Sequence, residues 1–366
     1  MRVLEIIDVY KDGGAEKVFD NFHSYCISNN INIKRLYFYK SISRPNDAFL
    51  LKNNAKTLIG KIIQQFLALV LLKQHLKKFS YDSIVSFLDR SNIVTILAAN
   101  RRKISVTVTV HNPPTIQYMK LGKNRKLVFK ILRYCYNLKN IKVVAVSKQV
   151  RDSLVEIGVQ NVDIVYNPLS AISTDVDKKM KEFDFIFVGR LSYQKAPWKL
   201  VKALYLLKQK FNVDYKCLIV GGGEYEQKLK KLCSSLELNE NIFFTGYVSN
   251  PIDYIQKSKC MVFTSFFEGF PITVLEAFSN NVPVIGSKCA IPNEVYDTTQ
   301  YSNFYYQNSE NFEDFNSDTF SKDDMSYSKI LFHALSSQNE LNNIARLGKE
   351  WILENCKISN FEEYLT

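Results

Sequence analysis

Short apolar runs alternate with longer amphipathic stretches along the whole chain. In the first half, apolar runs rich in β-branched and aromatic residues predict strands at 3–7, 33–39, 83–88, 106–110, 143–147 and 163–166. In the second half, the same pattern predicts strands at 185–189, 217–221, 242–246, 261–265 and 282–286. Strand–helix alternation of this kind requires parallel crossover units. Each half is therefore expected to be an α/β, doubly wound, Rossmann-like sheet.

A chain of 366 residues is long for a single hydrophobic core, which favours two domains. The segment 170–182, "SAISTDVDKKMKE", is polar and charged and lacks an apolar period, so it is predicted to be a linker. This division gives a first domain at 1–169 and a second domain at 183–347.

Glycine and polar residues follow many of the predicted strands. In open parallel sheets, ligands bind at the carboxyl ends of the strands, so these positions form the expected ligand edge of each domain. They are Gly13, Gly14, His111, Asn167, Arg190, Lys195, Gly222, Glu268 and Gly269.

The cysteine and histidine contents exclude several classes of protein. Seven cysteines form no C-x-x-C pair and there are only four histidines, which argues against a disulfide framework or a structural zinc site. The most apolar segment, 62–72, is too short to span a bilayer. These features predict a cytoplasmic protein in a reducing compartment.

Positive charge is concentrated in the first half of the chain. Residues 1–170 hold 27 Lys and Arg against 11 Asp and Glu, whereas residues 171–366 hold 21 against 25. The first half is therefore expected to face something anionic, either nucleic acid or acidic lipid. The basic and aromatic motifs of nucleic-acid-binding proteins are absent, which favours lipid.

The basic stretch 120–142 contains eight Lys and Arg and no acid. Four of its cations follow 3-4-3 spacing, which would place them on one face of a helix, and apolar residues would line another face. We predict that this stripe contacts an anionic membrane; a solvated stripe on a core helix is the alternative. The cations are Lys123, Lys126, Lys130 and Arg133, and the apolar residues are Leu127, Ile131, Cys135 and Leu138.

The segment "SFFEGFPITVLEAF" (265–278) places Glu268 and Glu276 on either side of a turn and a helix start. Pro271 suits the first position of a helix, whose free N–H groups would favour a phosphate. Glu268 would lie beside the group attached to that phosphate, and Glu276 could accept two ribose hydroxyls. This spacing suits a nucleoside diphosphate that carries a sugar.

Two further cations and one glycine turn fit the same ligand. Arg190 and Lys195 follow one strand and could both reach a diphosphate, although two solvated loop cations would show the same pattern. Gly13 and Gly14 allow close approach before a helix start, or form a plain turn. Neither a P-loop nor a dinucleotide-binding fingerprint is present.

Taken together, these segments resemble the retaining glycosyltransferases of family 4, which have the GT-B fold and include enzymes of bacterial O-antigen and capsule synthesis. The resemblance implies an N-terminal acceptor domain and a C-terminal nucleotide-sugar domain. It also implies a final helix, at about 348–366, that crosses back onto the first domain. The segments that carry it are "GGAEKVF", "VTVTVHNPP", "VVAVSKQVRDSL", "VYNPLS", "VGRLSYQK", "IVGGGEYEQKL", "IFFTGYVSNPIDYI" and "SFFEGFPITVLEAFSNNVPVIGS".

The resemblance also implies roles for individual residues. Arg190 and Lys195 would hold the diphosphate, Glu268 would contact the donor sugar, and Glu276 would hold the ribose. His111 would lie near the sugar and the acceptor. The other implied donor-binding residues are Gly13, Gly14, Asn167, Gly222, Tyr247, Val248, Gly269, Phe270, Pro271 and Ile272.

The chain departs from the family pattern at three places. The family often has glycine after the loop lysine, where this chain has Ala196–Pro197. It often has an acid before the strand at 261–265 and another soon after the strand at 282–286. This chain has Lys259–Cys260 and Ser287–Lys288 there, so its loop geometry and donor preference stay open.

The expected activity is transfer of a hexosyl or N-acetylhexosaminyl group from a nucleotide sugar, a UDP-sugar, to a hydroxyl with retained configuration. The expected acceptor is a lipid-linked or polysaccharide precursor at the inner face of the cytoplasmic membrane. No cofactor and no metal are expected, because the D-x-D at 175–177 falls in the predicted linker. The alternatives are a glycosidase that uses Glu268 and Glu276 and a nucleic-acid-binding protein.

Overall fold

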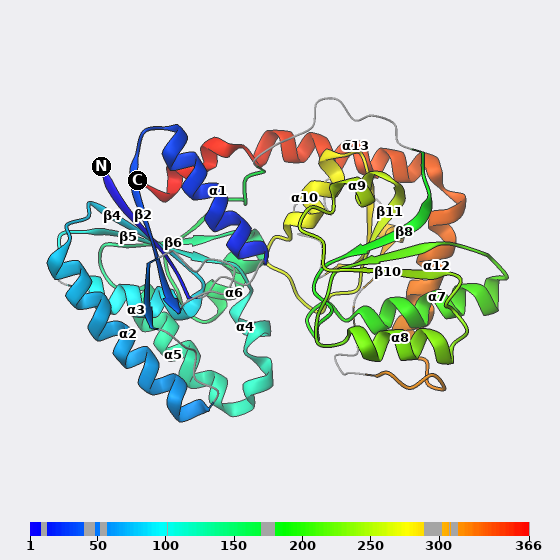
Figure 1. Cartoon of the computed structure of the whole chain (residues 1–366), viewed down its shortest axis with the longest axis horizontal. Helices are drawn as coiled ribbons and strands as arrows, with labels where there is room; N and C mark the ends of the chain where they lie inside the picture. The colour runs from blue at the N-terminus through cyan, green and yellow to red at the C-terminus, as the bar shows by residue number, and fades with distance from the viewer. Residues whose placement is uncertain are drawn as a thin grey trace. The chain divides into compact units, whose positions relative to one another are not determined.

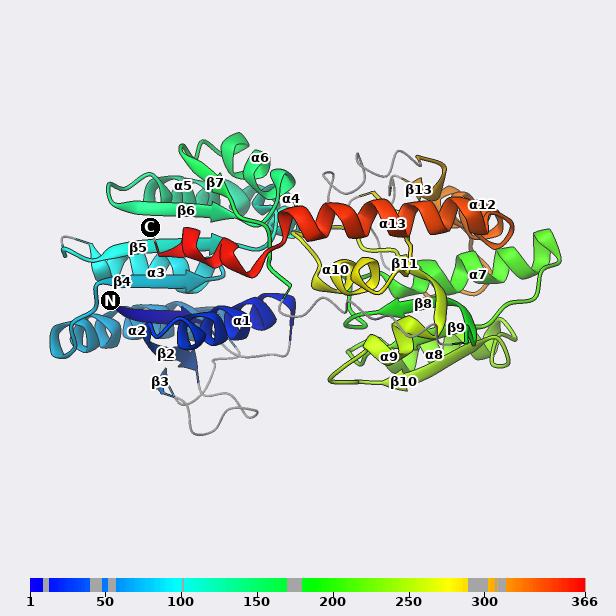
Figure 2. The same cartoon turned by 90° about the horizontal axis from the view of Figure 1, so that it is seen from above.

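The computed structural model describes residues 1–8, 13–39, 48–51, 57–100, 102–169, 180–288, 302–306, 308 and 314–365. The chain forms two compact units. One is Met1–Ser170 together with Ile358–Thr366, and the other is Ala171–Lys357. Each unit is an α/β layer structure built on a parallel sheet (Figures 1 and 2), so the predicted fold class is confirmed. Most of the predicted linker, including the D-x-D at 175–177, lies outside the described residues.

The sheet of the first unit has the strand order β3-β2-β1-β4-β5-β6-β7, and every neighbouring pair is parallel. Its central strands are buried because helices cover both faces, which explains their continuous apolar runs. Strand β3 was not predicted, since three residues are too few to show a period. The strands are β1 Arg2–Ile7, β2 Asn32–Tyr39, β3 Phe49–Leu51, β4 Ser83–Phe87, β5 Ser105–Val110, β6 Ile141–Ala145 and β7 Val162–Ile164.

Helices α2, α3 and α5 cover one face of this sheet, with α3 between the other two (Figure 2). Helix α1 and the C-terminal turn η3 cover the other face (Figure 1). The helices are α1 Gly14–Ser28, α2 Leu58–Lys78, α3 Asp89–Ala99, α4 Pro114–Gln117, η1 Met119–Asn124, α5 Arg125–Tyr136, α6 Lys148–Glu156 and η3 Ile358–Tyr364. Among the helices in the described ranges, none is long and apolar enough to cross a membrane.

The sheet of the second unit has the order β10-β9-β8-β11-β12-β13, again with parallel pairs throughout. Strand β13 has two residues and was not predicted. The strands are β8 Phe183–Val188, β9 Cys217–Val220, β10 Ile242–Gly246, β11 Ser258–Phe263, β12 Val284–Ser287 and β13 Tyr305–Tyr306. The helices are α7 Pro197–Phe211, α8 Glu226–Ser235, α9 Ile252–Gln256, α10 Ile272–Ser279, η2 Ser302–Phe304, α12 Lys322–Ser336 and α13 Gln338–Asn355.

The C-terminal segment differs from the expected helix at 348–366. Helix α13 ends at Asn355 and packs on α10 in the second unit, because Gly348 allows the ring of Phe278 to lie against the helix backbone. Only the 3₁₀ turn η3 belongs to the first unit. Its Phe361 lies 5.5 Å from the ring of Phe22, centroid to centroid. Aromatic packing, rather than a continuous helix, therefore attaches the C-terminus to the first unit.

The basic stripe also differs from its prediction. Lys123 lies in η1, before α5 begins at Arg125, so the four predicted cations do not share one α-helix. Leu127 and Ile131 are exposed, although a core helix would bury them. The reason is that α5 packs inward through Leu132, Cys135 and Tyr136, which follow 3-4 spacing. Of the apolar residues predicted on this helix, Cys135 belongs to the buried set, whereas Leu127 and Ile131 face outward.

Candidate active site

Two loops at the carboxyl edge of the second sheet are tied together by hydrogen bonds. They follow β8 and β11, which are neighbouring strands. The Phe266 N–H donates to the carbonyl of Gln194 at 2.8 Å, and Thr264 Oγ1 donates to the carbonyl of Lys195 at 2.9 Å. Gln194 Nε2 donates in turn to the carbonyl of Phe267 at 3.0 Å. The loops at 190–196 and 264–268 therefore form one unit, and Gln194, which the sequence analysis did not select, holds them in place.

This unit brings Lys195 and Glu268 into contact. Lys195 Nζ lies 2.6 Å from Glu268 Oε1, and the two side chains are only 16% and 8% exposed. Gln194 Nε2 lies 3.4 Å from the other oxygen of Glu268. Lys195 is the residue expected to bind a diphosphate and Glu268 the residue expected to bind a sugar. The two side chains are thus in direct contact in one ion pair.

Ala196 explains the first departure from the family pattern. It has a left-handed backbone conformation, with φ 44° and ψ 48°, at the start of α7. Glycine adopts this conformation without steric cost, whereas alanine pays about 1–2 kcal/mol. The loop keeps the geometry that glycine would favour, even though alanine occupies it.

The helix α10 carries the second glutamate. Pro271 was predicted to be the first residue of this helix. It is instead the residue just before the helix, and α10 begins at Ile272. Its N-terminal end lies at the carboxyl edge of the sheet, and the Val274 N–H there donates to the carbonyl of Pro271 at 3.0 Å. Glu276 lies in the second turn and is buried. Phe270, Pro271 and Ile272 are buried as well, so this helix start is firmly positioned.

A glycine turn packs against the loop that carries Arg190. At Gly221, φ is +138°, and a Cβ there would lie 2.0 Å from the carbonyl oxygen of Gly189. The Leu191 N–H donates to the carbonyl of Gly222 at 2.9 Å. The backbones touch here, so the glycine has a packing reason that is independent of any ligand. Arg190 itself is exposed and can reach toward a ligand.

The remaining predicted donor-binding residues of this unit lie around the same edge. Gly222 lies next to Tyr247, because a Cβ at Gly222 would be 3.7 Å from the Cβ of Tyr247. Tyr247 is exposed, and Val248 is half-buried beside it. The exposed ring of Tyr247 thus offers an apolar face to solvent beside a glycine turn.

In the first unit, His111 lies at the carboxyl end of β5 in a dry environment. Its Nε2 lies 3.0 Å from Thr109 Oγ1, and its ring stacks on Phe87 at 5.9 Å. Burial lowers the pKa of His111 to about 4. The imidazole is therefore neutral at physiological pH and can offer a hydrogen bond but not a positive charge.

The glycines of the first unit also lie where the sequence analysis expected a ligand edge. Gly13 precedes α1 and Gly14 is its first residue, while residues 9–12 between β1 and this helix are outside the described ranges. Asn167 is buried after β7. These residues belong to the first unit, and the lysine–glutamate pair belongs to the second.

Two acidic side chains of the first unit were missed by the sequence analysis. Asp8 follows β1, and its Oδ2 lies 2.7 Å from Nη1 of Arg90. Asp89 follows β4 and accepts hydrogen bonds from the hydroxyls of Tyr118 and Tyr136 at 2.8 and 2.9 Å. Burial raises the pKa of Asp89. Their positions directly after predicted strands could have revealed them, because that is the edge where polar ligands bind.

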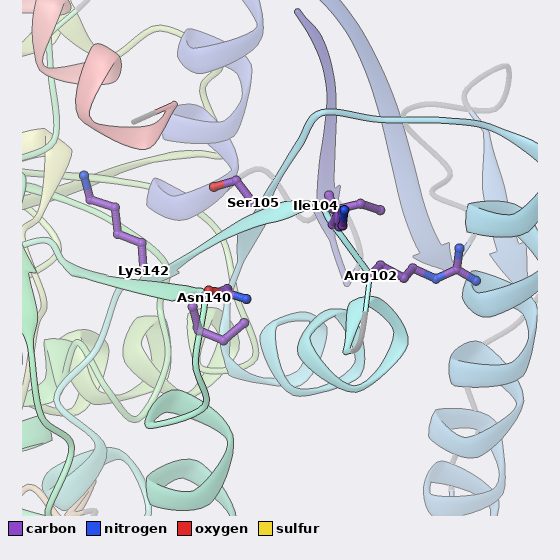
Figure 3. A pocket seen from close by; sticks show the side chains of 7 residues that line it. Arg102, Ile104, Ser105, Asn140 and Lys142 are labelled. Carbon is purple, nitrogen blue, oxygen red and sulfur yellow. The ribbon is translucent and has the colours of Figure 1, made fainter.

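A basic pocket lies at the opposite edge of the first sheet (Figure 3). It is lined by residues 102–105 and 140–142, at the amino ends of β5 and β6. The Arg102 side chain is already hydrogen-bonded within the protein, since its Nη1 donates to the carbonyl of Leu76 at 2.8 Å. The pocket is therefore separate from the ligand edge.

Two family profiles match the chain in sequence order. The profile described as "Glycosyltransferase Family 4" matches residues 46–171, and the profile described as "Glycosyl transferases group 1" matches residues 170–316. The chain belongs to these glycosyltransferases. Its two units have the GT-B fold, as the resemblance implied.

Several curated relatives of this chain are glycosyltransferases. An uncharacterized glycosyltransferase of Methanocaldococcus jannaschii is 31% identical over 58% of this chain and 57% of its own length. The capsular polysaccharide biosynthesis glycosyltransferase CapH of Staphylococcus aureus is 28% identical over 63% of this chain and 66% of its own. An N-acetylgalactosaminyltransferase of Campylobacter jejuni that acts on an undecaprenol-linked acceptor is 28% identical over 78% of this chain and 79% of its own. The matches to the first two thus span less than two thirds of those proteins.

Solved structures support the fold. The lipopolysaccharide outer core galactosyltransferase WaaB, in its apo form, has a TM-score of 0.68 and 19% identity over 100% of this chain and 99% of its own. HepE of Anabaena in complex with UDP has a TM-score of 0.73 and 14% identity over 100% of this chain and 98% of its own. At these identities the similarity concerns the fold alone.

Proposed function

We propose that this glycosyltransferase transfers a sugar from a UDP-sugar to a hydroxyl of a lipid-linked or polysaccharide precursor, with retained anomeric configuration. In this proposal the first unit binds the acceptor and the second binds the donor. Bacterial surface-polysaccharide synthesis is the corresponding process. The curated relatives named above support it, because one takes part in capsule synthesis and another acts on an undecaprenol-linked acceptor.

The Lys195–Glu268 pair is the observation that carries the proposal. A nucleoside diphosphate sugar presents negative charge next to neutral hydroxyls, and this pair presents a cation next to a carboxylate. The start of α10 adds N–H groups and the positive end of a helix dipole at the same sheet edge. Such a site fits a sugar diphosphate better than it fits a free phosphate or a free sugar.

Each side chain then has one task during transfer. Negative charge grows on the departing diphosphate, and Arg190, Lys195 and the start of α10 stabilise it. Glu268 accepts hydrogen bonds from sugar hydroxyls and fixes the sugar's orientation. Glu276 accepts the two ribose hydroxyls from the second turn of α10. His111 belongs to the first unit, and its lowered pKa keeps the imidazole neutral, so it offers a bound ligand a hydrogen bond rather than a positive charge.

The glycosidase alternative fits the structure less well. Two carboxyl groups that hydrolyse one glycosidic bond must both face that bond. Glu268 is paired with Lys195, and Glu276 is buried within α10. The arrangement favours one carboxylate for the sugar and one for the nucleoside.

A donor panel tests the proposal. Thermal shifts with UDP-, GDP-, ADP- and CMP-sugars should show stabilisation by UDP-sugars above the others. The anomeric configuration of the product, read by NMR, should match that of the donor. Release of free sugar from an aryl glycoside at a rate above that of nucleotide-sugar turnover would favour the glycosidase instead.

A further inference from the structure

The first half of helix α2 exposes a continuous apolar face. Four large side chains there are between 43% and 68% exposed, and they fall within one arc of the helix. The opposite side of α2 packs inward through Ala68, Leu72 and Leu76. Large apolar side chains grouped on one exposed face mark an interaction surface rather than ordinary surface scatter. The exposed residues are Ile62, Ile63, Phe66 and Leu67.

Helix α5 exposes an apolar stripe next to a basic one. Leu127, Ile131 and Tyr134 repeat at 4-3 spacing and are between 41% and 63% exposed. Lys126 and Lys130 precede the first two by one position and form the neighbouring stripe. In η1, just before this helix, Met119 and Leu121 are exposed together with Lys123.

Both faces belong to the same side of the first unit. Helices α2 and α5 each pack on α3, which lies between them (Figure 2). Helix α2 follows β3, and η1–α5 follows β5 by way of α4, so both begin near the carboxyl edge of the sheet. Figure 1 shows the start of α2 and the η1–α5 turn at the same lower margin of the unit.

Charge identifies the occupant of this surface. Residues 58–78 and 119–136 contain no Asp or Glu, while lysine recurs beside the apolar side chains. Protein interfaces are depleted in lysine at their centres. Helices that lie in a membrane interface combine exposed Leu, Ile and Phe with Lys and Arg.

We propose that the starts of α2 and of η1–α5 together dock on an anionic lipid bilayer. The apolar side chains enter the boundary between head groups and acyl chains, and Lys123, Lys126 and Lys130 contact lipid phosphates. Docking beside the carboxyl edge would bring a lipid-linked hydroxyl to the ligand edge of the first unit, and in this respect the inference rests on the proposed function. Arg133 is not included, because its aliphatic chain lies against Gly158.

A charge variant with a matched control tests the electrostatic part. The variant changes Lys123, Lys126 and Lys130 to Ser. The control changes Lys73, Lys77 and Lys78 to Ser, which removes the same charge from the far end of α2. Each cation near anionic lipid contributes about fivefold to binding, so the variant should lose about a hundredfold in partitioning to phosphatidylglycerol vesicles. The control should stay within a few-fold of wild type.

A second pair of variants tests the apolar part. Phe66→Ser removes an exposed ring from the proposed surface, and Leu353→Ser removes an exposed apolar side chain from the second unit. Co-sedimentation with vesicles should weaken about tenfold for Phe66→Ser and stay unchanged for Leu353→Ser. Wild type should bind neutral phosphatidylcholine vesicles far more weakly, and 0.5 M salt should release it from anionic ones.

Several results would overturn the inference. Equal sedimentation of the lysine variant, its control and wild type at low salt would exclude the surface. Self-association in the absence of lipid that Phe66→Ser abolishes would assign it to a second copy of the chain. Nucleotide-sugar hydrolysis or transfer to a water-soluble acceptor should be unchanged in the lysine variant. These soluble assays fail if the proposed donor chemistry is wrong, whereas the vesicle assay fails if the surface is wrong.

Discussion

The ion pair between Lys195 and Glu268 gives a prediction that can be worked through from the structure. At a separation of 2.6 Å, the attraction between unit charges is about 6 kcal/mol for an effective dielectric constant of about 20. Much of this is offset because both side chains are largely removed from water. Removing only one partner leaves the other charge partly buried without compensation, which costs about 3 kcal/mol.

A double-mutant cycle separates these contributions. Lys195→Met and Glu268→Gln should each lower the free energy of unfolding by about 3 kcal/mol. The double variant should lose much less than the sum of the two, because it leaves no uncompensated charge. The coupling energy should therefore be about 2–3 kcal/mol and only weakly dependent on salt, unlike that of an exposed pair.

Tryptophan fluorescence offers a clean measurement of this cycle. The chain has two tryptophans, Trp198 and Trp351, and both lie in the second unit with the ion pair. Urea unfolding followed by their emission reports on that unit, even if the two units unfold separately. If the double variant loses as much stability as the two single variants combined, the two side chains are uncoupled and do not form a buried ion pair.

The same variants connect the pair to catalysis. Glu268→Gln frees Lys195 from its partner, so UDP should bind at least as tightly as to wild type while turnover falls about 10- to 100-fold. Lys195→Met should weaken UDP binding by a similar factor. Weaker UDP binding in Glu268→Gln would show that this carboxylate holds the nucleotide rather than the sugar.

Three further predictions concern the nucleotide, the metal and pH. Glu276→Ala should weaken UDP binding about 10- to 100-fold in calorimetry through loss of the ribose contact, and unchanged affinity would remove Glu276 from the site. Transfer should persist in excess EDTA, and loss of activity restored by manganese or magnesium would contradict metal-independent chemistry. The pKa of His111 is about 4 in the folded protein, below its ordinary value of 6.5. As the pH falls, His111 therefore takes up a proton in the unfolded chain before it does so in the folded protein, and the free energy of unfolding falls. Lowering the pH from 7.5 to 5 should cost wild type about 2 kcal/mol more than His111→Gln in urea unfolding, and equal losses would mean that His111 is not in a dry environment.

Much of the architecture could be predicted from the sequence because it depends on local periodicity. Buried parallel strands are apolar along their whole length, so the run at 83–88 and the run at 185–189 were recognisable without neighbours. Strands β3 and β13 were missed because two or three residues show no period. Their pairing depends on adjacent strands that supply hydrogen bonds, which is tertiary information.

In the candidate site, too, some features follow from the local sequence and others from the tertiary structure. The sequence by itself determined that Glu268 and Glu276 lie before and within one helix, since eight residues of local chain connect them. Only the tertiary structure decided that Glu268 pairs with Lys195, because 73 positions separate them and the parallel order of β8 and β11 brings their loops together. It also decided that Leu127 and Ile131 face outward. A helix pattern gives the relative angles of its side chains, but the contact with α3 sets which angle is buried.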